Sequence, residues 1–178
     1  MSETGRLALF IDGENLYATT KALGFDIDFR KLLAVFQESS RLLRAFYYTA
    51  DFEDQQGPST RPLIDWLSYN GYDVRTRPVR EFDANGRRKA RTSLGIELAV
   101  NAFESAPHLD EMVLFTGDGD FRPLVEAVQR RGIRVTIVST IAVHPPLIAE
   151  ELRRQADCFV DLADLRSKLA RDARARQL

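Results

Sequence analysis

Residues 112–138 read MVLFTGDGDFRPLVEAVQRRGIRVTIV, and this stretch decides the fold. The apolar run Met112–Phe115 and the β-branched run Ile133–Val138 are each typical of a buried strand. Between them, residues 121–131 have the apolar spacing of a helix, which is expected to end before Gly132. A strand, a helix and a second strand in this order predict a right-handed crossover between two parallel strands.

The same alternation of short apolar runs and amphipathic segments continues along the rest of the chain. Further strands are predicted at Leu7–Ile11, Leu42–Tyr48, Tyr72–Thr76 and Cys158–Val160, and further helices near 29–36, 63–67, 93–105 and 147–154. This pattern predicts the α/β class, as a three-layer α/β/α, Rossmann-like domain with a mostly parallel sheet of five to six strands. We expect one domain over residues 1–165, followed by a basic C-terminal helical tail over 166–178.

The composition excludes several classes of protein. The chain has 178 residues, 44% of them hydrophobic, which is too apolar for a disordered protein. Its single cysteine, Cys158, excludes an internal disulfide and a cysteine-based zinc site. No apolar run approaches the roughly 18 residues that span a membrane. We therefore expect no membrane association and a cytoplasmic location, while a homodimer is left open.

Acidic residues follow two of the predicted strands directly. Asp12 follows the first strand, and Asp118 and Asp120 follow the strand at 112–115. Ligands of open parallel sheets bind beyond the carboxyl ends of the strands, where the strand order reverses. In a 3-2-1-4-5 order these two loops meet there, so the three carboxylates are predicted to share one cleft. Because like charges repel, such a cluster favours a bound Mg²⁺ or Mn²⁺, and with it metal-assisted attack of water on a phosphodiester.

Two polar residues and an alternative interpretation accompany this hypothesis. Asn15 and Thr116 are placed to orient a water molecule or a phosphate oxygen. An aspartate between a strand and a helix is also often a helix N-cap, and Asp12 or Asp120 could serve in that way. The grouping of these residues with Gly13, Gly117 and Gly119 favours the metal site over capping alone.

Two motifs carry a family resemblance, namely FIDGENL at residues 10–16 and LFTGDGDFRPLV at residues 114–125. Over about Leu7–Leu162 the chain resembles the NYN domain family, a branch of the PIN-like ribonuclease superfamily. Family members typically read SGDSDF-x-PLV in the second motif, and Thr116 and Gly119 replace the two serines here. The resemblance implies an NYN/PIN-like domain that cleaves RNA with a divalent metal. It also implies catalytic carboxylates at the positions of Asp12, Asp118 and Asp120, with Asn15 at the polar position of the first motif.

A third segment departs from the family pattern. Relatives usually carry a segment similar to KG-N-M-D-I-E-L-A-V-D-A, whereas residues 91–102 read RTSLGIELAVNA. Gly95 and Asn101 thus stand where acidic residues are expected, and Glu97 is retained. Asn101 can still ligate a metal through its carbonyl oxygen, and Glu97, four residues away on the same helical face, can partly compensate as a catalytic group. The alternative is a catalytically degenerate NYN-like module that binds RNA or a protein partner.

A basic segment precedes this helix and lies between residues 75 and 91. Lysine and arginine contacts to phosphate supply most of the affinity for nucleic acid, so we expect RNA as the partner, single-stranded or structured. The predicted RNA-binding residues are Arg77, Arg80, Arg87, Arg88, Lys89 and Arg91. The near-neutral net charge of −1 then reflects separate acidic and basic regions rather than an absence of charge.

A rival enzyme class also places an aspartate after the first strand. Haloacid-dehalogenase-type phosphohydrolases use that aspartate as a nucleophile and usually need a second aspartate two residues later. Glu14 occupies that position here, and no convincing lysine motif precedes the late acidic loop. The sequence therefore favours a ribonuclease over this phosphohydrolase.

Overall fold

The computed structural model describes residues 5–51, 60–78, 85 and 94–172. The strands, in chain order, are β1 (Arg6–Asp12), β2 (Arg41–Asp51), β3 (Asp73–Pro78), β4 (Glu111–Phe115), β5 (Arg134–Ser139) and β6 (Cys158–Asp161). The α-helices are α1 (Gly13–Leu23), α2 (Phe29–Gln37), α3 (Arg61–Tyr69), α4 (Gly95–Ser105), α5 (Arg122–Gln129), α6 (Glu150–Gln155) and α7 (Arg166–Leu169). Two short 3₁₀ helices are η1 (Ala106–His108) and η2 (Gly119–Phe121).

The six strands form one parallel sheet in the order β3-β2-β1-β4-β5-β6. This arrangement confirms the predicted α/β fold and its 3-2-1-4-5 order, with β6 added at the edge. β1 lies in the middle, and Leu9, Phe10 and Ile11 are fully buried. A continuous apolar run suits such a strand because both faces of a parallel sheet are covered by helices. The strand order reverses between β1 and β4, so the loops that follow them are neighbours.

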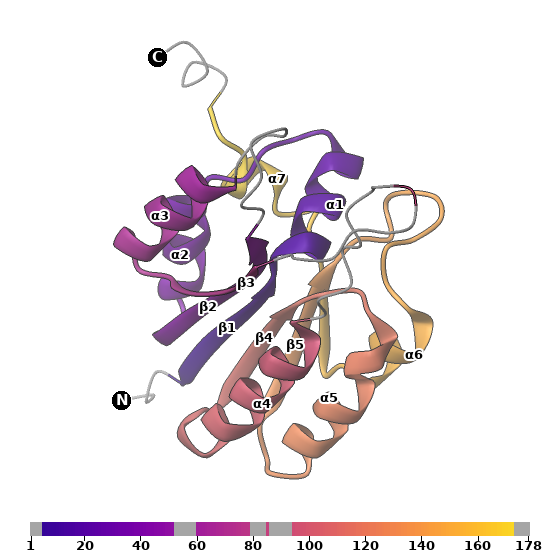
Figure 1. Ribbon diagram of the computed structural model, residues 1–178. Helices are drawn as coiled ribbons and strands as arrows, with labels where there is room; N and C mark the ends of the chain where they lie inside the picture. The colour runs from indigo at the N-terminus through magenta and orange to yellow at the C-terminus, as the bar shows by residue number, and fades with distance from the viewer. Residues whose placement is uncertain (1–4, 52–59, 79–84, 86–93, 173–178) are drawn as a thin grey trace.

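Side chains alternate along β1 between two hydrophobic cores. Ala8 and Phe10 join the core under α4, α5 and α6, whereas Leu7, Leu9 and Ile11 join the core under α1, α2, α3 and α7. Figure 1 shows α2 and α3 on one side of the sheet and α4 and α5 on the other. The three layers expected from the sequence are therefore present. In the described ranges, every helix is too short or too polar to cross a bilayer.

Two helical segments differ from the sequence prediction. The helix expected over 147–154 begins only at Glu150. The reason is that the Leu147 amide donates to the Thr140 carbonyl and the Ala149 amide donates to the Gly117 carbonyl, so both amides are bonded outside a helix. The helix expected over 121–131 is divided into η2 and the shorter α5, which has ended by Arg130.

The first helix, α1, is not among the predicted helical ranges, although the N-cap suggested for Asp12 implies a helix there and is confirmed. Asp12 is its N-cap, Glu14 lies in its first turn, and Gly24 ends it with a left-handed backbone conformation (φ +71°). The segment has few large apolar residues, so its helical periodicity is weak. Its capping residues are the better indicator of this helix.

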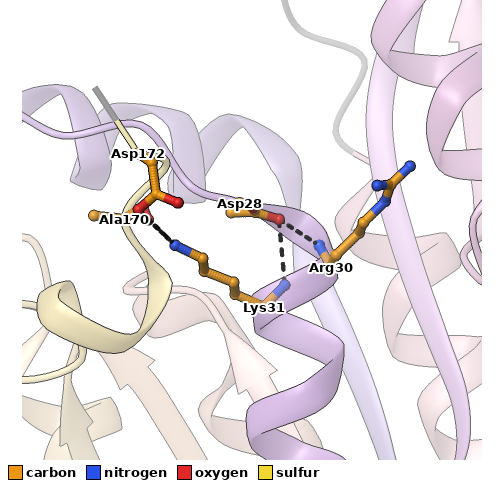
Figure 2. Close-up of polar contacts among 5 residues, drawn as sticks. All are labelled: Asp28, Arg30, Lys31, Ala170 and Asp172. Atoms are coloured by element: carbon orange, nitrogen blue, oxygen red, sulfur yellow. Dashed lines mark hydrogen bonds and ion pairs between the residues drawn. The ribbon is translucent and has the colours of Figure 1, made fainter. Parts of the chain in front are cut away.

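Residues 166–172 lie against α2. Within it, α7 contains only Arg166–Leu169, and the Leu169 side chain is fully buried. The chain then runs beside the loop between α1 and α2, where Ile27 and Ala170 form a β-bridge. Lys31 on α2 donates to the Ala170 carbonyl and pairs with Asp172, at 3.0 Å in each case (Figure 2). Residues 169–172 are thereby fixed to the first third of the chain.

Candidate functional site

The candidate site contains Asp12 and Asp118, which lie at the carboxyl ends of the two central strands, β1 and β4. Asp12 is the last residue of β1, and its carboxylate accepts a hydrogen bond from the Asn15 amide at 3.2 Å. Asp118 follows β4, and its carboxylate accepts one from the Asp120 amide at 2.9 Å. Each carboxylate therefore also caps a helix, α1 for Asp12 and η2 for Asp118. The N-cap suggested for Asp120 was wrong, because Asp118 occupies the capping position.

Thr116 connects the two acids. It is 1% exposed, and its hydroxyl oxygen accepts a hydrogen bond from the Asp118 amide at 3.2 Å. The same hydroxyl bonds to the Asp12 carboxylate, which lowers the pKa of Asp12. One buried hydroxyl therefore contacts the carboxylate of Asp12 and the backbone amide of Asp118. The role expected of Thr116 in orienting water or a phosphate oxygen stays a prediction.

The negative charges of Asp12 and Asp118 are only partly balanced by their surroundings. Burial raises the pKa of Asp12, and repulsion from Asp118 raises it further, while hydrogen bonds from Asn15, Glu14 and Thr116 oppose these effects only in part. Burial also raises the pKa of Glu14, with a further contribution from the charge of Asp12. A cation at this position would relieve the repulsion.

The raised pKa of Asp12 makes a prediction for stability against pH. Because the folded protein binds the Asp12 proton more tightly than the unfolded chain does, this carboxyl favours folding below its unfolded pKa. That contribution is lost as the pH rises through the higher, folded pKa. The free energy of unfolding of the wild type should therefore fall relative to that of Asp12→Asn as the pH rises from about 4 toward neutrality. Urea unfolding of both proteins over this range measures the difference, and a constant difference would contradict it.

The remaining predicted acids do not join the pair. Asp120 is exposed, as Asp118 is, and the contact between them is made by the Asp120 backbone amide. Among the residues that the structure describes, no three histidine, cysteine, aspartate or glutamate side chains are placed to hold a metal ion together. The expected cluster of three carboxylates is thus reduced to two. Mg²⁺ is commonly held by one or two carboxylates, with water and substrate phosphates completing the shell, and the oxygen donors of Asp12, Asp118 and Thr116 fit that arrangement.

The two polar residues of α4 are both engaged by the protein. The Asn101 side-chain amide donates to the Tyr48 hydroxyl at 3.1 Å, and Glu97 faces Arg77 of β3 at 3.8 Å. Tyr48 is the residue in register with Asp12, so α4 reaches the same end of the sheet as the acidic pair. Burial raises the pKa of Tyr48 to about 12, so its hydroxyl keeps its proton at neutral pH. Of the predicted RNA-binding residues, only Arg77 lies in the described chain; Arg80, Arg87, Arg88, Lys89 and Arg91 lie outside it.

The glycines near the two acids allow other segments of the chain to approach closely. A Cβ on Gly13 would lie 2.7 Å from the Tyr48 carbonyl oxygen and 2.8 Å from the Tyr47 ring. A Cβ on Gly117 would overlap the Leu147 carbonyl oxygen. These close approaches bring β2 and the segment before α6 against the loops that carry Asp12 and Asp118. The glycines therefore serve the packing of the acidic loops.

Sequence reasoning did not identify the tyrosines of β2 as part of this site. Tyr47 and Tyr48 are 4% and 2% exposed, and most strand aromatics of this kind belong only to a core. The signal that could have singled them out is register: Tyr48 pairs with Asp12, and Tyr47 pairs with Ile11. A residue one strand away at the same height as a predicted ligand is a candidate for the same site.

Comparisons with known proteins agree with this fold. The NYN domain model matches residues 6–163. The low amplitude and bright protein LabA of Synechococcus elongatus is 37% identical over 176 residues, which is 95% of this chain and 90% of that protein. The crystal structure of VPA0982 from Vibrio parahaemolyticus, a protein of unknown function, superposes with a TM-score of 0.75 at 25% identity, over 95% of this chain and 98% of that one. With its parallel sheet, its acidic loops and this match over most of its length, the chain belongs to the NYN domain family, whose domains are RNA-related.

Proposed function

We propose that this protein is a metal-dependent ribonuclease that cleaves RNA phosphodiester bonds with one Mg²⁺ or Mn²⁺ held at Asp12 and Asp118. The observation that carries the proposal is the paired arrangement of these two carboxylates, in which burial and mutual repulsion raise the pKa of Asp12. Membership of a ribonuclease-like family supports the choice of RNA as substrate.

Each residue of the site has a defined task in this proposal. Asp12 and Asp118 bind the cation, and Thr116 fixes their relative orientation through its shared hydroxyl. Asn15 begins α1 beside Asp12, where it can orient water or a phosphate oxygen, and Asp120 is an exposed acid at the rim. When bound, the cation supplies Lewis-acid activation of the phosphodiester and of the attacking water.

A second candidate function is binding of RNA or a protein partner without cleavage. The contacts of α4 favour it, since Asn101 is bonded to Tyr48 and Glu97 is paired with Arg77, while Gly95 carries no side chain for a ligand. One variant distinguishes the two functions. In Gly95→Asp, Asn101→Asp, the protonated Tyr48 hydroxyl can donate to the new carboxylate at 101, so the substitution there keeps its hydrogen bond.

The test compares the natural protein with this double variant on labelled single-stranded RNA, with Mn²⁺ or with EDTA. We expect the natural protein to cleave only with Mn²⁺ and the double variant to cleave about tenfold faster, because added carboxylates strengthen the metal site. Cleavage by the double variant alone would establish the binding module as the natural function. Cleavage that persists in EDTA would contradict the metal-dependent mechanism.

A further inference from the structure

A second site lies beside the acidic pair, in a pocket between α1, the start of α2 and the start of α3. Its volume is about 920 Å³, and neither Asp12 nor Asp118 lines it. The lining side chains with ligand-binding chemistry, which define the α1–α3 pocket here, are Tyr17, Lys21, Arg30, Tyr47, Trp66 and Arg171. Pockets of this volume bind small molecules or single residues of a polymer.

The pocket combines aromatic rings with positive charge. The Arg30 guanidinium lies 5.3 Å from the centre of the Trp66 ring, and the Lys21 ammonium lies 5.8 Å from that of Tyr17, which is 65% exposed. Arg30, Lys21 and Arg171 form no ion pair with a carboxylate of the described residues. Planar rings and guanidinium groups stack on nucleobases, and unpaired cations bind phosphate.

Two carboxylates, those of Asp26 and Asp28, also line the pocket beside these cations. The Asp28 carboxylate accepts hydrogen bonds from the Arg30 and Lys31 amides, and so caps α2. Figure 2 shows the Arg30 side chain directed away from Asp28, Lys31 and Asp172. The Lys31 ammonium donates hydrogen bonds to the Ala170 carbonyl and the Asp172 carboxylate, and these contacts hold residues 169–172 in place. The Arg171 amide donates to the Asp26 carbonyl at 2.8 Å, so this segment forms one wall of the pocket.

Tyr47 connects the pocket to the acidic pair. Its ring packs against Gly13, the residue after Asp12, and the same side chain lines the pocket. It is 4% exposed, yet its hydroxyl forms no hydrogen bond with another described residue. The Tyr47 side chain therefore lies between the pocket and the loop of Asp12, and its hydroxyl is available to donate a hydrogen bond to a ligand.

We propose that the α1–α3 pocket binds one nucleotide of an RNA strand, with its base against Trp66, Tyr17 and the Arg30 guanidinium and its phosphate at Lys21, Arg30 and Arg171. The inference takes its choice of RNA from the proposed function, because a strand in this pocket can present a neighbouring phosphate to Asp12 and Asp118. Tyr47 donates its hydroxyl to the bound nucleotide. The pocket thus sets the position of the strand relative to the acidic pair.

The sequence provides a built-in reporter, since Trp66 is the single tryptophan of the chain. The experiment titrates the full chain in EDTA with an adenine hexaribonucleotide, with adenosine 5′-monophosphate and with ribose 5-phosphate, exciting tryptophan where nucleobases do not absorb. We expect saturable quenching by the hexanucleotide, weaker quenching by the monophosphate and none by ribose 5-phosphate. No quenching by the hexanucleotide overturns the proposal, as does equal quenching by ribose 5-phosphate. Quenching by the monophosphate alone overturns the assignment to an RNA strand.

Variants locate the binding within the pocket, with affinity measured by anisotropy of a labelled hexanucleotide. Lys21→Ala and Arg30→Ala should each weaken binding by about tenfold and reduce the slope of log K against log salt by about 0.7. Tyr47→Phe should weaken binding about fivefold without lowering the unfolding midpoint, since its hydroxyl has no partner to lose. The matched control is Arg134→Ala, at the amino end of β5, which is not among the residues that line the pocket. Equal losses in this control would contradict a specific pocket.

The same titration separates this inference from the proposed function. Asp12 does not line the pocket. In Asp12→Asn we therefore expect the hexanucleotide to quench the Trp66 fluorescence as in the wild type, while RNA cleavage is lost. If the hexanucleotide quenched the wild type but the wild type did not cleave RNA, the ribonuclease proposal would be contradicted and the nucleotide pocket supported. If the wild type cleaved RNA without any quenching, the nucleotide pocket would be contradicted and the ribonuclease proposal supported.

Discussion

Replacing Asp12 with asparagine is expected to lower the rate of Mn²⁺-dependent RNA cleavage at least a hundredfold. Even residues that only support a metal ligand are worth about 10- to 100-fold in affinity or activity, and Asp12 is proposed as a ligand itself. Asparagine is as good an N-cap as aspartate, so the hydrogen bond from the Asn15 amide and the start of α1 should persist. The loss would then report the missing charge and not a damaged fold.

The control is the same substitution at the amino end of a central strand, opposite the end that carries the acidic pair. Asp110 precedes β4 and pairs with Arg6 at 3.0 Å, far along the strand from Asp118. Asp110→Asn should cleave at the wild-type rate, even if its ion pair with Arg6 contributes to stability. Single-turnover cleavage of labelled RNA, followed on a gel, measures all three proteins. Cleavage that survives in both Asp12→Asn and Asp118→Asn would exclude the acidic pair as the catalytic site.

The second large effect concerns stability. Gly117→Ala should reduce the free energy of unfolding by about 2–3 kcal/mol or more, which is the upper part of the range of about 1–3 kcal/mol found for overpacked sites. Its added Cβ would overlap the Leu147 carbonyl oxygen, which is backbone and cannot rotate aside. The Gly117 carbonyl also accepts the Ala149 amide at 2.8 Å, so the two segments are fixed to each other. Reduced unfolded-state entropy, worth about 0.4–1 kcal/mol in favour of alanine, is too small to compensate.

Gly5→Ala is the matched control, because its Cβ would meet only the Asp110 Cβ at 3.8 Å, an ordinary contact. Its free energy of unfolding should stay within about 0.5 kcal/mol of the wild type. Urea unfolding midpoints compare the three proteins. If Gly117→Ala unfolded at the wild-type midpoint, the segment before α6 would have to move independently of the loop that carries Asp118.

The fold was predictable because its strands are continuous apolar runs and its helices are amphipathic. The position of Asp12 and Asp118 also followed, since the order of the strands brings the ends of β1 and β4 together. Whether Asp120 joins them was not predictable, because that depends on which of two nearby aspartates caps the following 3₁₀ helix. The helix α1 was missed for a related reason: its caps are distinct, whereas its apolar periodicity is weak.

The α1–α3 pocket could not be predicted, because it joins residues that are distant in the sequence. Lys21 and Arg30 lie near the beginning of the chain, Trp66 follows β2, and Arg171 arrives only through the contact of residues 169–172 with the α1–α2 loop. None of these residues belongs to a motif. Their proximity is a result of tertiary packing, in which the isolated bridge between Ile27 and Ala170 is the decisive contact.

That bridge also has a consequence for the order of events during synthesis. Domains fold as the chain emerges from its amino end, and contacts between distant residues form late. Lys31 and Asp172 are 141 positions apart, so the wall contributed by residues 169–172 is made after all six strands. A nascent chain that already contains Asp12 and Asp118 therefore still lacks a complete pocket. If the pocket binds a nucleotide as proposed, that binding would begin only after Arg171 has left the ribosome.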